Sequence, residues 1–88
     1  MRKERWAAAL EKGMKQLRKT GHDVRNDPKS ADWKVALAGV LKKQMLSTNR
    51  WLGDQLNMGP PAAVCRYVSE ALVGKRPGVL AIMAKLNH

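Results

Sequence analysis

A Gly-Pro-Pro triplet at residues 59–61 divides the stretch of residues 48–72 into two short segments. In the first segment, Trp51, Leu52 and Leu56 have the spacing of one face of an amphipathic helix. Glycine tolerates positive φ and proline cannot continue the hydrogen-bond ladder, so the triplet must end this helix. The stretch is therefore predicted to form two short helices joined by a tight turn.

The ends and faces of these two helices follow from single residues. Thr48 suits the N-cap of the first helix, because its hydroxyl can accept an amide proton that the first turn leaves unpaired. Pro61 suits the first position of the second helix, where a missing amide hydrogen does no harm. The second helix is predicted to bury Val64, Val68, Ala71 and Leu72 and to expose Ala62, Ala63, Arg66, Ser69 and Glu70. This is the pattern of a helix-turn-helix.

Helical spacing continues on both sides of this stretch, and strand-forming residues never alternate cleanly. A first helix is predicted over residues 5–19, ending near Gly21. A floor helix under the motif is predicted from residues 30–32 to about Leu46, and a short last helix over residues 79–86. Because the chain has 88 residues, we expect one small all-α fold, a bundle of four to five helices containing a helix-turn-helix.

Each of these helices has an apolar side that is predicted to pack in the core. The first helix contributes Trp6, Leu10, Met14 and Leu17. The floor helix contributes Trp33, Leu37, Leu41 and Met45, and its Lys34, Lys42 and Lys43 are predicted to face outward. The last helix contributes Val79, Leu80, Met83 and Leu86.

A polar segment, residues 22–30, carries an Asn-Asp-Pro turn signal and is predicted to be a linker. It divides the chain into two expected parts. Residues 1–29 would form an N-terminal basic amphipathic helix and the linker. Residues 30–88 would form a helix-turn-helix DNA-binding domain with a short C-terminal helix.

The net charge of +10, from 17 basic and 7 acidic residues, favours a polyanionic partner. Nucleic acid is the commonest such partner for a small helical protein, although a basic surface can also be merely solvated. A single cysteine, Cys65, excludes an internal disulfide and suits a reducing compartment. No apolar run approaches the roughly 20 residues needed to span a bilayer, and the charged N-terminus is no secretory signal. We expect a cytoplasmic protein that does not bind membranes.

Residues for enzyme chemistry are sparse. His22 lies in the predicted linker and His88 is the last residue, so no pair has the spacing of a metal site. Cys65 has no histidine nearby in sequence and is predicted to be a small, half-buried residue rather than a nucleophile. There is no glycine-rich phosphate loop. We therefore expect no active site, no metal, no cofactor and no small-molecule substrate.

In a helix-turn-helix, the second helix enters the major groove with its N-terminal residues at the base edges. The candidates for this position are Pro61, Ala62, Ala63, Arg66 and Ser69. The guanidinium of Arg66 can reach guanine O6 and N7, and the small alanines let the helix lie deep. The alternative for Arg66 is a solvated side chain or an ion pair with Glu70, four residues on.

Phosphate contacts are expected from a helix N-terminus and from flanking cations. The candidates are Lys42, Lys43, Thr48, Asn49, Arg50, Lys75 and Arg76. If about five to seven of them neutralise phosphates, affinity falls steeply with salt. Such contacts fix the position of the protein but carry no sequence information.

Two short motifs resemble the C-terminal region of bacterial REP-associated tyrosine transposases and related transposase-like proteins. They are Lys-Val-Ala-Leu-Ala at residues 34–38 and Trp-Leu-Gly-Asp-Gln-Leu-Asn-Met-Gly at residues 51–59, followed by Val64-Cys65. The resemblance covers roughly half of the chain. The departures are Gly53 for alanine and Cys65 for serine, which we expect to be harmless, and the prolines of the turn, which stiffen it.

The resemblance implies a DNA-binding accessory module, whose target is a duplex or a hairpin. In the family, this module is attached to a catalytic domain with a His-x-His metal site and a nucleophilic tyrosine. Neither motif is present here, and Tyr67 lies inside the second motif helix, so it is not assigned as a nucleophile. The alternative function is a helical protein-interaction or homodimerisation module, in which an apolar stripe contacts a partner. RNA binding is disfavoured, because no stacking platform of exposed aromatics is predicted.

Overall fold

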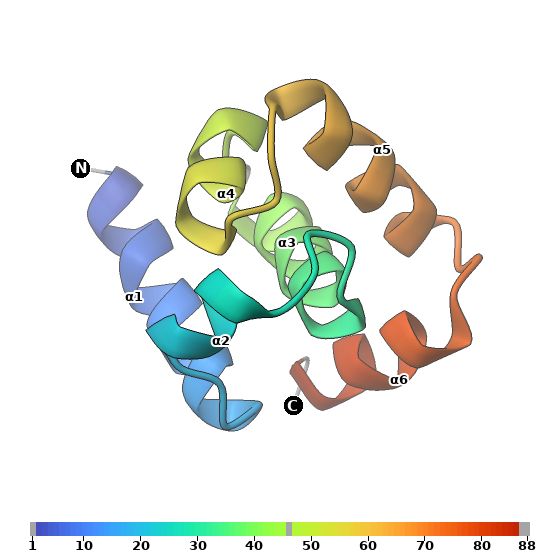
Figure 1. Cartoon of the computed structure of the whole chain (residues 1–88), viewed down its shortest axis with the longest axis horizontal. Coiled ribbons are helices and arrows are strands. Elements are labelled where there is room, and N and C mark those ends of the chain that lie inside the picture. Colours follow the sequence, from blue (N-terminus) through green and yellow to red (C-terminus); the bar gives the residue numbers. More distant parts are fainter. Residues whose placement is uncertain (1, 46, 87–88) are drawn as a thin grey trace.

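The computed structural model describes residues 2–45 and 47–86, and these ranges fold into six α-helices without a strand (Figure 1). The helices are α1 (Arg2–Gln16), α2 (Gly21–Asn26), α3 (Asp32–Met45), α4 (Asn49–Leu56), α5 (Pro61–Leu72) and α6 (Pro77–Leu86). The all-helical class is confirmed, with one or two more helices than expected. No helix in the described ranges has both the length and the apolarity to cross a membrane.

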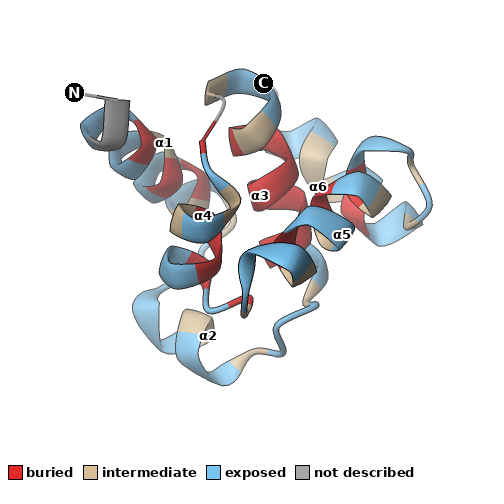
Figure 2. Ribbon diagram, turned by 90° about the horizontal axis from the view of Figure 1, so that it is seen from above, coloured by how far each residue is buried: buried red, intermediate tan, exposed pale blue. Residues whose placement is uncertain are grey.

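Helix α3 occupies the centre of the molecule and contacts α1, α4, α5 and α6. Every residue from Trp33 to Leu41 is buried, so this part of α3 is enclosed on all sides (Figure 2). A helix with neighbours on every side must be small or apolar all round, and residues 35–41 of α3 satisfy this condition. The predicted floor helix is therefore the core of the whole molecule.

Helix α1 packs on α3 through the predicted stripe, in which Trp6 and Leu10 are buried. The indole N–H of Trp6 donates a hydrogen bond to the backbone oxygen of Met45 at 3.1 Å, and its ring meets the Trp51 ring edge-on with centroids 5.5 Å apart. These contacts tie the start of the chain to the region between α3 and α4.

The end of α1 differs from the prediction, because the helix stops at Gln16 and not near Gly21. Arg18 adopts the left-handed conformation at φ 57°. The amide of Lys19 then donates to the oxygen of Met14 at 2.8 Å, and the amide of Arg18 donates to the oxygen of Lys15 at 3.1 Å. These are the two bonds of a Schellman cap, here closed without a glycine.

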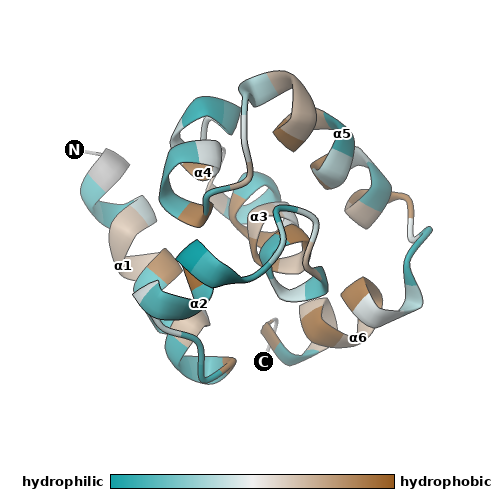
Figure 3. Ribbon diagram, in the orientation of Figure 1, coloured by the Kyte–Doolittle hydropathy of each residue, from teal (hydrophilic) through white to brown (hydrophobic). Residues whose placement is uncertain are grey.

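Helix α2 lies within the segment that was predicted to be a linker. Gly21 begins this helix, and Thr20 precedes it as the N-cap. The carboxylate of Asp23 accepts a hydrogen bond from the amide of Thr20 at 2.9 Å, and this bond holds the pKa of Asp23 below its ordinary value of 3.8. No residue of α2 is buried, and the helix is mostly hydrophilic (Figure 3). Polar bonds, together with the half-buried Val24 that packs against the core, hold this helix in place.

Lys34 makes the most important of these polar bonds, and the prediction that it faces outward is wrong. It is fully buried, because α2 covers this side of α3. Its Nζ donates to the backbone oxygens of Val24 at 2.7 Å and Asp27 at 3.0 Å, near the C-terminal end of α2. Burial lowers the pKa of Lys34, and the nearby carboxylate of Asp27 opposes this shift.

Helices α4 and α5, which were predicted to form the motif, both begin as the local chemistry predicts, but α4 ends differently. The hydroxyl of Thr48 accepts a hydrogen bond from the amide of Trp51 at 3.2 Å, which confirms the N-cap of α4. Pro61 is the first residue of α5. Helix α4, however, ends at Leu56, before the Gly-Pro-Pro triplet, because Asn57 takes the left-handed conformation at φ 52°.

Two predicted core leucines are instead exposed. Val64, Val68 and Ala71 of α5 are buried, but Leu72 is 49% exposed because it lies one residue, or about 100°, beyond this stripe. Val79 of α6 is buried, but Leu80 is 46% exposed. Leu80 extends over Gly74 in the connection between α5 and α6. Half-buried Ile82, Met83 and Leu86 complete the packed side of α6.

Candidate nucleic-acid interface

Helices α4 and α5 pack directly on each other, with residues 57–60 between them. Gly53 of α4 lies so close to the turn that a β-carbon there would overlap the carbonyl oxygen of Gly59 and approach Cγ2 of Val64 to 3.1 Å. Met58 is fully buried, and Gly59 has a positive φ of 95°. Glycines on both sides and a buried methionine therefore fix the distance between the helices. Gly53 is not interchangeable with alanine here, contrary to our expectation.

The base-facing candidates lie along the outer side of α5. Pro61, Ala62, Arg66 and Ser69 are exposed, and Ala63 is half-buried. The guanidinium of Arg66 lies 5.2 Å from the centroid of the Tyr67 ring. Within the described residues Arg66 forms no ion pair with Glu70, so the alternative of an i+4 pair is not realised in the structure. The hydrogen-bonding groups of Arg66 therefore face solvent.

A hollow of about 570 Å³ lies between α4 and the start of α5. Its lining comprises Arg50, Gly53, Asp54, Asn57, Gly59, Pro60 and Pro61. Arg50 is an exposed cation, whereas its neighbours Thr48 and Asn49 are uncharged. The hydroxyl of Thr48 caps α4, and Oδ1 of Asn49 is buried without a hydrogen-bond partner among the described residues. Of the three, Arg50 presents a free cation.

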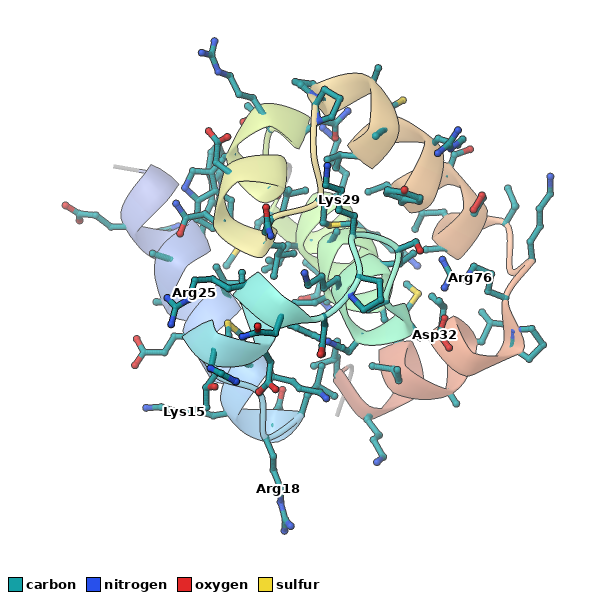
Figure 4. The ribbon with its side chains drawn as sticks, viewed as in Figure 1. Lys15, Arg18, Arg25, Lys29, Asp32 and Arg76 are labelled. Carbon is teal, nitrogen blue, oxygen red and sulfur yellow. The ribbon has the colours of Figure 1, made fainter. Side chains whose placement is uncertain are left out.

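The flanking cations fall into two groups. Nζ of Lys42 donates to the backbone oxygen of Ser47 at 3.0 Å. The guanidinium of Arg76 donates to the oxygen of Ser30 at 2.7 Å and pairs with the carboxylate of Asp32 (Figure 4). Both side chains therefore hold the fold together. Lys43 and Lys75, by contrast, are exposed and form no ion pair within the described part of the chain.

These candidates do not gather at a single place. Lys75 and Arg76 follow the C-terminal end of α5, whereas Pro61 begins this helix. Twelve helical residues separate the two ends by about 18 Å. Lys42 and Lys43 lie near the end of α3. The free cation that the structure places beside the start of α5 is Arg50, in the hollow described above.

Sequence reasoning missed a second cation beside the turn, Lys29. Its side chain extends from the loop before α3 toward the connection between α4 and α5 (Figure 4). A β-carbon built on Gly59 would lie 3.7 Å from Cδ and 3.8 Å from Nζ of Lys29. Lys29 was predicted to lie in a linker. Nothing in its local sequence indicates that this segment packs beside the turn between α4 and α5.

The remaining candidates for chemistry are the histidine, cysteine and carboxylate side chains. No cluster of these side chains in the described part of the chain has a geometry for a metal ion. Cys65 is a free, exposed thiol, and not half-buried as predicted. A groove of about 390 Å³ between α1 and α3 is lined mainly by apolar residues of these helices.

Comparison with protein-family models, with curated proteins and with solved structures finds no match for this chain. The resemblance to the transposase C-terminal region therefore rests on the two short motifs alone.

Proposed function

We propose that the chain is a DNA-binding helix-turn-helix module without catalytic activity of its own, in which α4 and α5 are the motif and α5 enters the major groove. The observation that carries this proposal is the close approach of Gly53 to Gly59. It fixes the turn, and the outer side of α5 forms no ion pair within the described part of the chain. A net charge of +10 supplies the attraction for DNA.

The contacts in this proposal divide into base readers and phosphate contacts. Ala62 and Ala63 are small enough to bring the start of α5 close to the bases, where Arg66 can donate to guanine O6 and N7. Arg50 lies in the hollow at the start of α5 and binds the phosphate backbone. With one strong base reader, we expect modest sequence preference.

Two further features accompany the proposal. Because of the motif resemblance, we infer that the chain is a module of the same kind as the accessory part of a bacterial transposase-like protein. The free thiol of Cys65 favours a reducing compartment, so we place the protein in the cytoplasm.

The test compares Arg66→Ala with Arg50→Ala on a pool of duplexes and hairpins, by measuring Kd at several salt concentrations. Arg66→Ala is expected to reduce the preference among sequences, at a cost of about 1–3 kcal/mol on the best site. Arg50→Ala is expected to weaken binding to all sequences alike and to reduce the salt slope by about 1.

Two results count against the proposal. A wild-type Kd above about 0.1 mM at low salt for every sequence rules out DNA binding, since even nonspecific binders exceed this affinity. Identical effects of the two substitutions would refute the division into base reader and phosphate contact.

A second candidate function is homodimerisation, and an exposed apolar patch favours it. The patch comprises Leu72, Val73 and Leu80, which are 49%, 63% and 46% exposed. The stripes expected to contact a partner are largely used inside the molecule, since Trp6, Leu10 and Val79 are buried. The patch at the α5–α6 connection holds the exposed large hydrophobic side chains of the described residues.

A further inference from the structure

Helix α2 and the loop after it lie beside the turn of the proposed motif. Helix α2 contacts α4, and the side-chain amide of Asn57 donates to the backbone oxygen of Val24 at 3.5 Å. Beyond α2, Lys29 lies over Gly59, with Nζ 3.8 Å from the position of a β-carbon there. This segment therefore borders the start of α5, although it is separated from that helix by about thirty residues of sequence.

The acidic and basic side chains of this segment differ in whether they have partners in the fold. The carboxylate of Asp23 is held by the amide of Thr20, and Oδ2 of Asp27 accepts from the indole N–H of Trp33 at 2.7 Å. Asp27 also lies 3.9 Å from Nζ of Lys19. Both acidic groups of the segment thus have partners in the fold.

The cations of the segment, in contrast, have none. Arg25 and Lys29 are exposed, and neither forms an ion pair or a hydrogen bond among the described residues. The guanidinium of Arg25 lies over Gly21, on the exposed side of α2. The segment therefore presents two cations without partners among the described residues: Lys29 lies beside the turn, and Arg25 lies on the exposed side of α2.

The segment is also held in a fixed position. Nζ of the buried Lys34 binds the oxygens of Val24 and Asp27, and Trp33 binds the Asp27 side chain. These bonds converge on the end of α2, two residues before Lys29. A cation fixed before binding loses less conformational freedom when it meets its ligand than one on a mobile linker.

We propose that α2 and the loop of residues 27–31 form a second phosphate-binding arm of the DNA interface. In this arm, Lys29 contacts a backbone phosphate beside the start of α5, and Arg25 contacts another on the same side. The ligand is the phosphodiester backbone, so the arm adds affinity and fixes the orientation of the motif without reading sequence. The inference rests on the proposed DNA-binding function.

The test compares Lys29→Gln and Arg25→Gln with Lys12→Gln, each of which removes one exposed positive charge. Lys12 is a matched control, because it borders hollows whose linings contain no residue of α2, α4 or α5. Kd for a duplex is measured from about 0.05 to 0.3 M salt, with circular dichroism to confirm that each variant is folded. Lys29→Gln and Arg25→Gln are each expected to lower the salt slope by about 0.9 and the affinity roughly fivefold at 0.1 M salt, for all sequences alike. Lys12→Gln is expected to match the wild type within about twofold, since long-range attraction between exposed charges is largely screened at this salt concentration.

A second measurement needs no substitution. The wild-type protein is acetylated with and without saturating duplex, and the modification of each lysine is measured by mass spectrometry. DNA is expected to reduce the acetylation of Lys29 at least about threefold more than that of Lys12. A phosphate that is hydrogen-bonded to the ammonium group blocks its reaction with the reagent.

The outcomes separate this inference from the function on which it rests. If the wild type binds no duplex or hairpin, DNA binding itself fails. If the wild type binds but Lys29→Gln behaves like Lys12→Gln and Lys29 is not protected, the motif binds DNA without the arm, and this inference is overturned.

Discussion

At the scale of single residues, Gly53 decides how α4 and α5 meet. Its absent β-carbon leaves the space that the carbonyl oxygen of Gly59 occupies. A backbone oxygen cannot rotate away as the end of a flexible side chain can, so any larger residue must displace the turn. Since Met58 on that turn is fully buried, such a displacement also disturbs the core.

Gly53→Ala is therefore expected to lower the free energy of unfolding by about 1–3 kcal/mol, because overpacking strains a well-packed site. Urea denaturation followed by circular dichroism measures this loss. Gly21→Ala is the control, since a β-carbon there meets nothing nearer than Nη1 of Arg25 at 3.9 Å. An unfolding free energy for Gly53→Ala within about 0.5 kcal/mol of the wild type, the range of a typical surface substitution, would contradict this account.

The roles of single residues at the starts of α4 and α5 were predicted correctly from sequence, because these roles depend on nearby residues of the same helix. Thr48 caps α4 and Pro61 begins α5 because both roles depend on neighbouring atoms of the same helix. Gly53 was expected to be equivalent to alanine, because spacing along α4 does not reveal which backbone atom will approach it. The same limit applies to Lys29, whose neighbour Gly59 lies thirty residues away in sequence.

At the scale of elements, α2 illustrates a signal that the sequence did contain. Thr20 and Asp23 have the spacing of a capping pattern, and the structure places them at the start of α2. The helix was missed because its polar sequence and the Asn-Asp-Pro turn signal are typical of a linker. A helix without buried residues has no apolar stripe by which periodicity could identify it. The position of α2 over Lys34 could not be predicted, since it depends on bonds between separate elements.

The burial of Lys34 predicts how pH affects stability. Burial lowers the folded-state pKa below the ordinary value of 10.5, so between these two values the unfolded chain binds more protons than the folded one. Deprotonation then favours the folded state, and stability due to Lys34 rises with pH in this window. The neutral amine keeps two N–H donors for the oxygens of Val24 and Asp27.

Comparison with Lys34→Met isolates this effect, because methionine keeps an apolar stem and cannot titrate. The unfolding free energy of the wild type, relative to that of the variant, is expected to rise as pH increases toward 10.5. The rise is about 1.4 kcal/mol for each pH unit between the lowered pKa and this value. Urea denaturation at a series of alkaline pH values measures it. A relative stability that is constant or falls over this range would show that burial does not control the charge of Lys34.

At the scale of the whole molecule, one core joins residues of α1, α3, α4, α5 and α6 around the buried residues 33–41 of α3. Helical periodicity predicted this class of fold because α1, α4, α5 and α6 each carry an apolar stripe. It misplaced Lys34 because it assumes that every helix has a solvent side. Periodicity also predicted wrongly that Leu72 and Leu80 are buried. The apolar spacing along one helix does not show how far the neighbouring helix extends to cover it.

The net charge and the apolar patch have opposite effects on self-association. Two copies that each carry +10 repel one another, whereas burial of Leu72, Val73 and Leu80 in a dimer would be favourable. Salt shortens the range of the repulsion, from about 30 Å at 0.01 M to about 10 Å at 0.1 M, and does not weaken apolar contacts. In the proposed complex, the phosphates of DNA would also neutralise part of the charge of each copy.

We therefore expect a monomer at low salt that dimerises as salt is raised, as measured by light scattering from about 0.01 to 0.5 M salt. Leu80→Glu is expected to remain monomeric throughout, because it puts a carboxylate in the centre of the apolar patch. Ala81→Glu is the matched control, since it adds the same charge at an exposed neighbour on α6 outside the patch. If Ala81→Glu prevents association as fully as Leu80→Glu, charge and not the patch controls assembly. If the wild type remains a monomer at every salt concentration and on DNA, the patch is not a dimer contact.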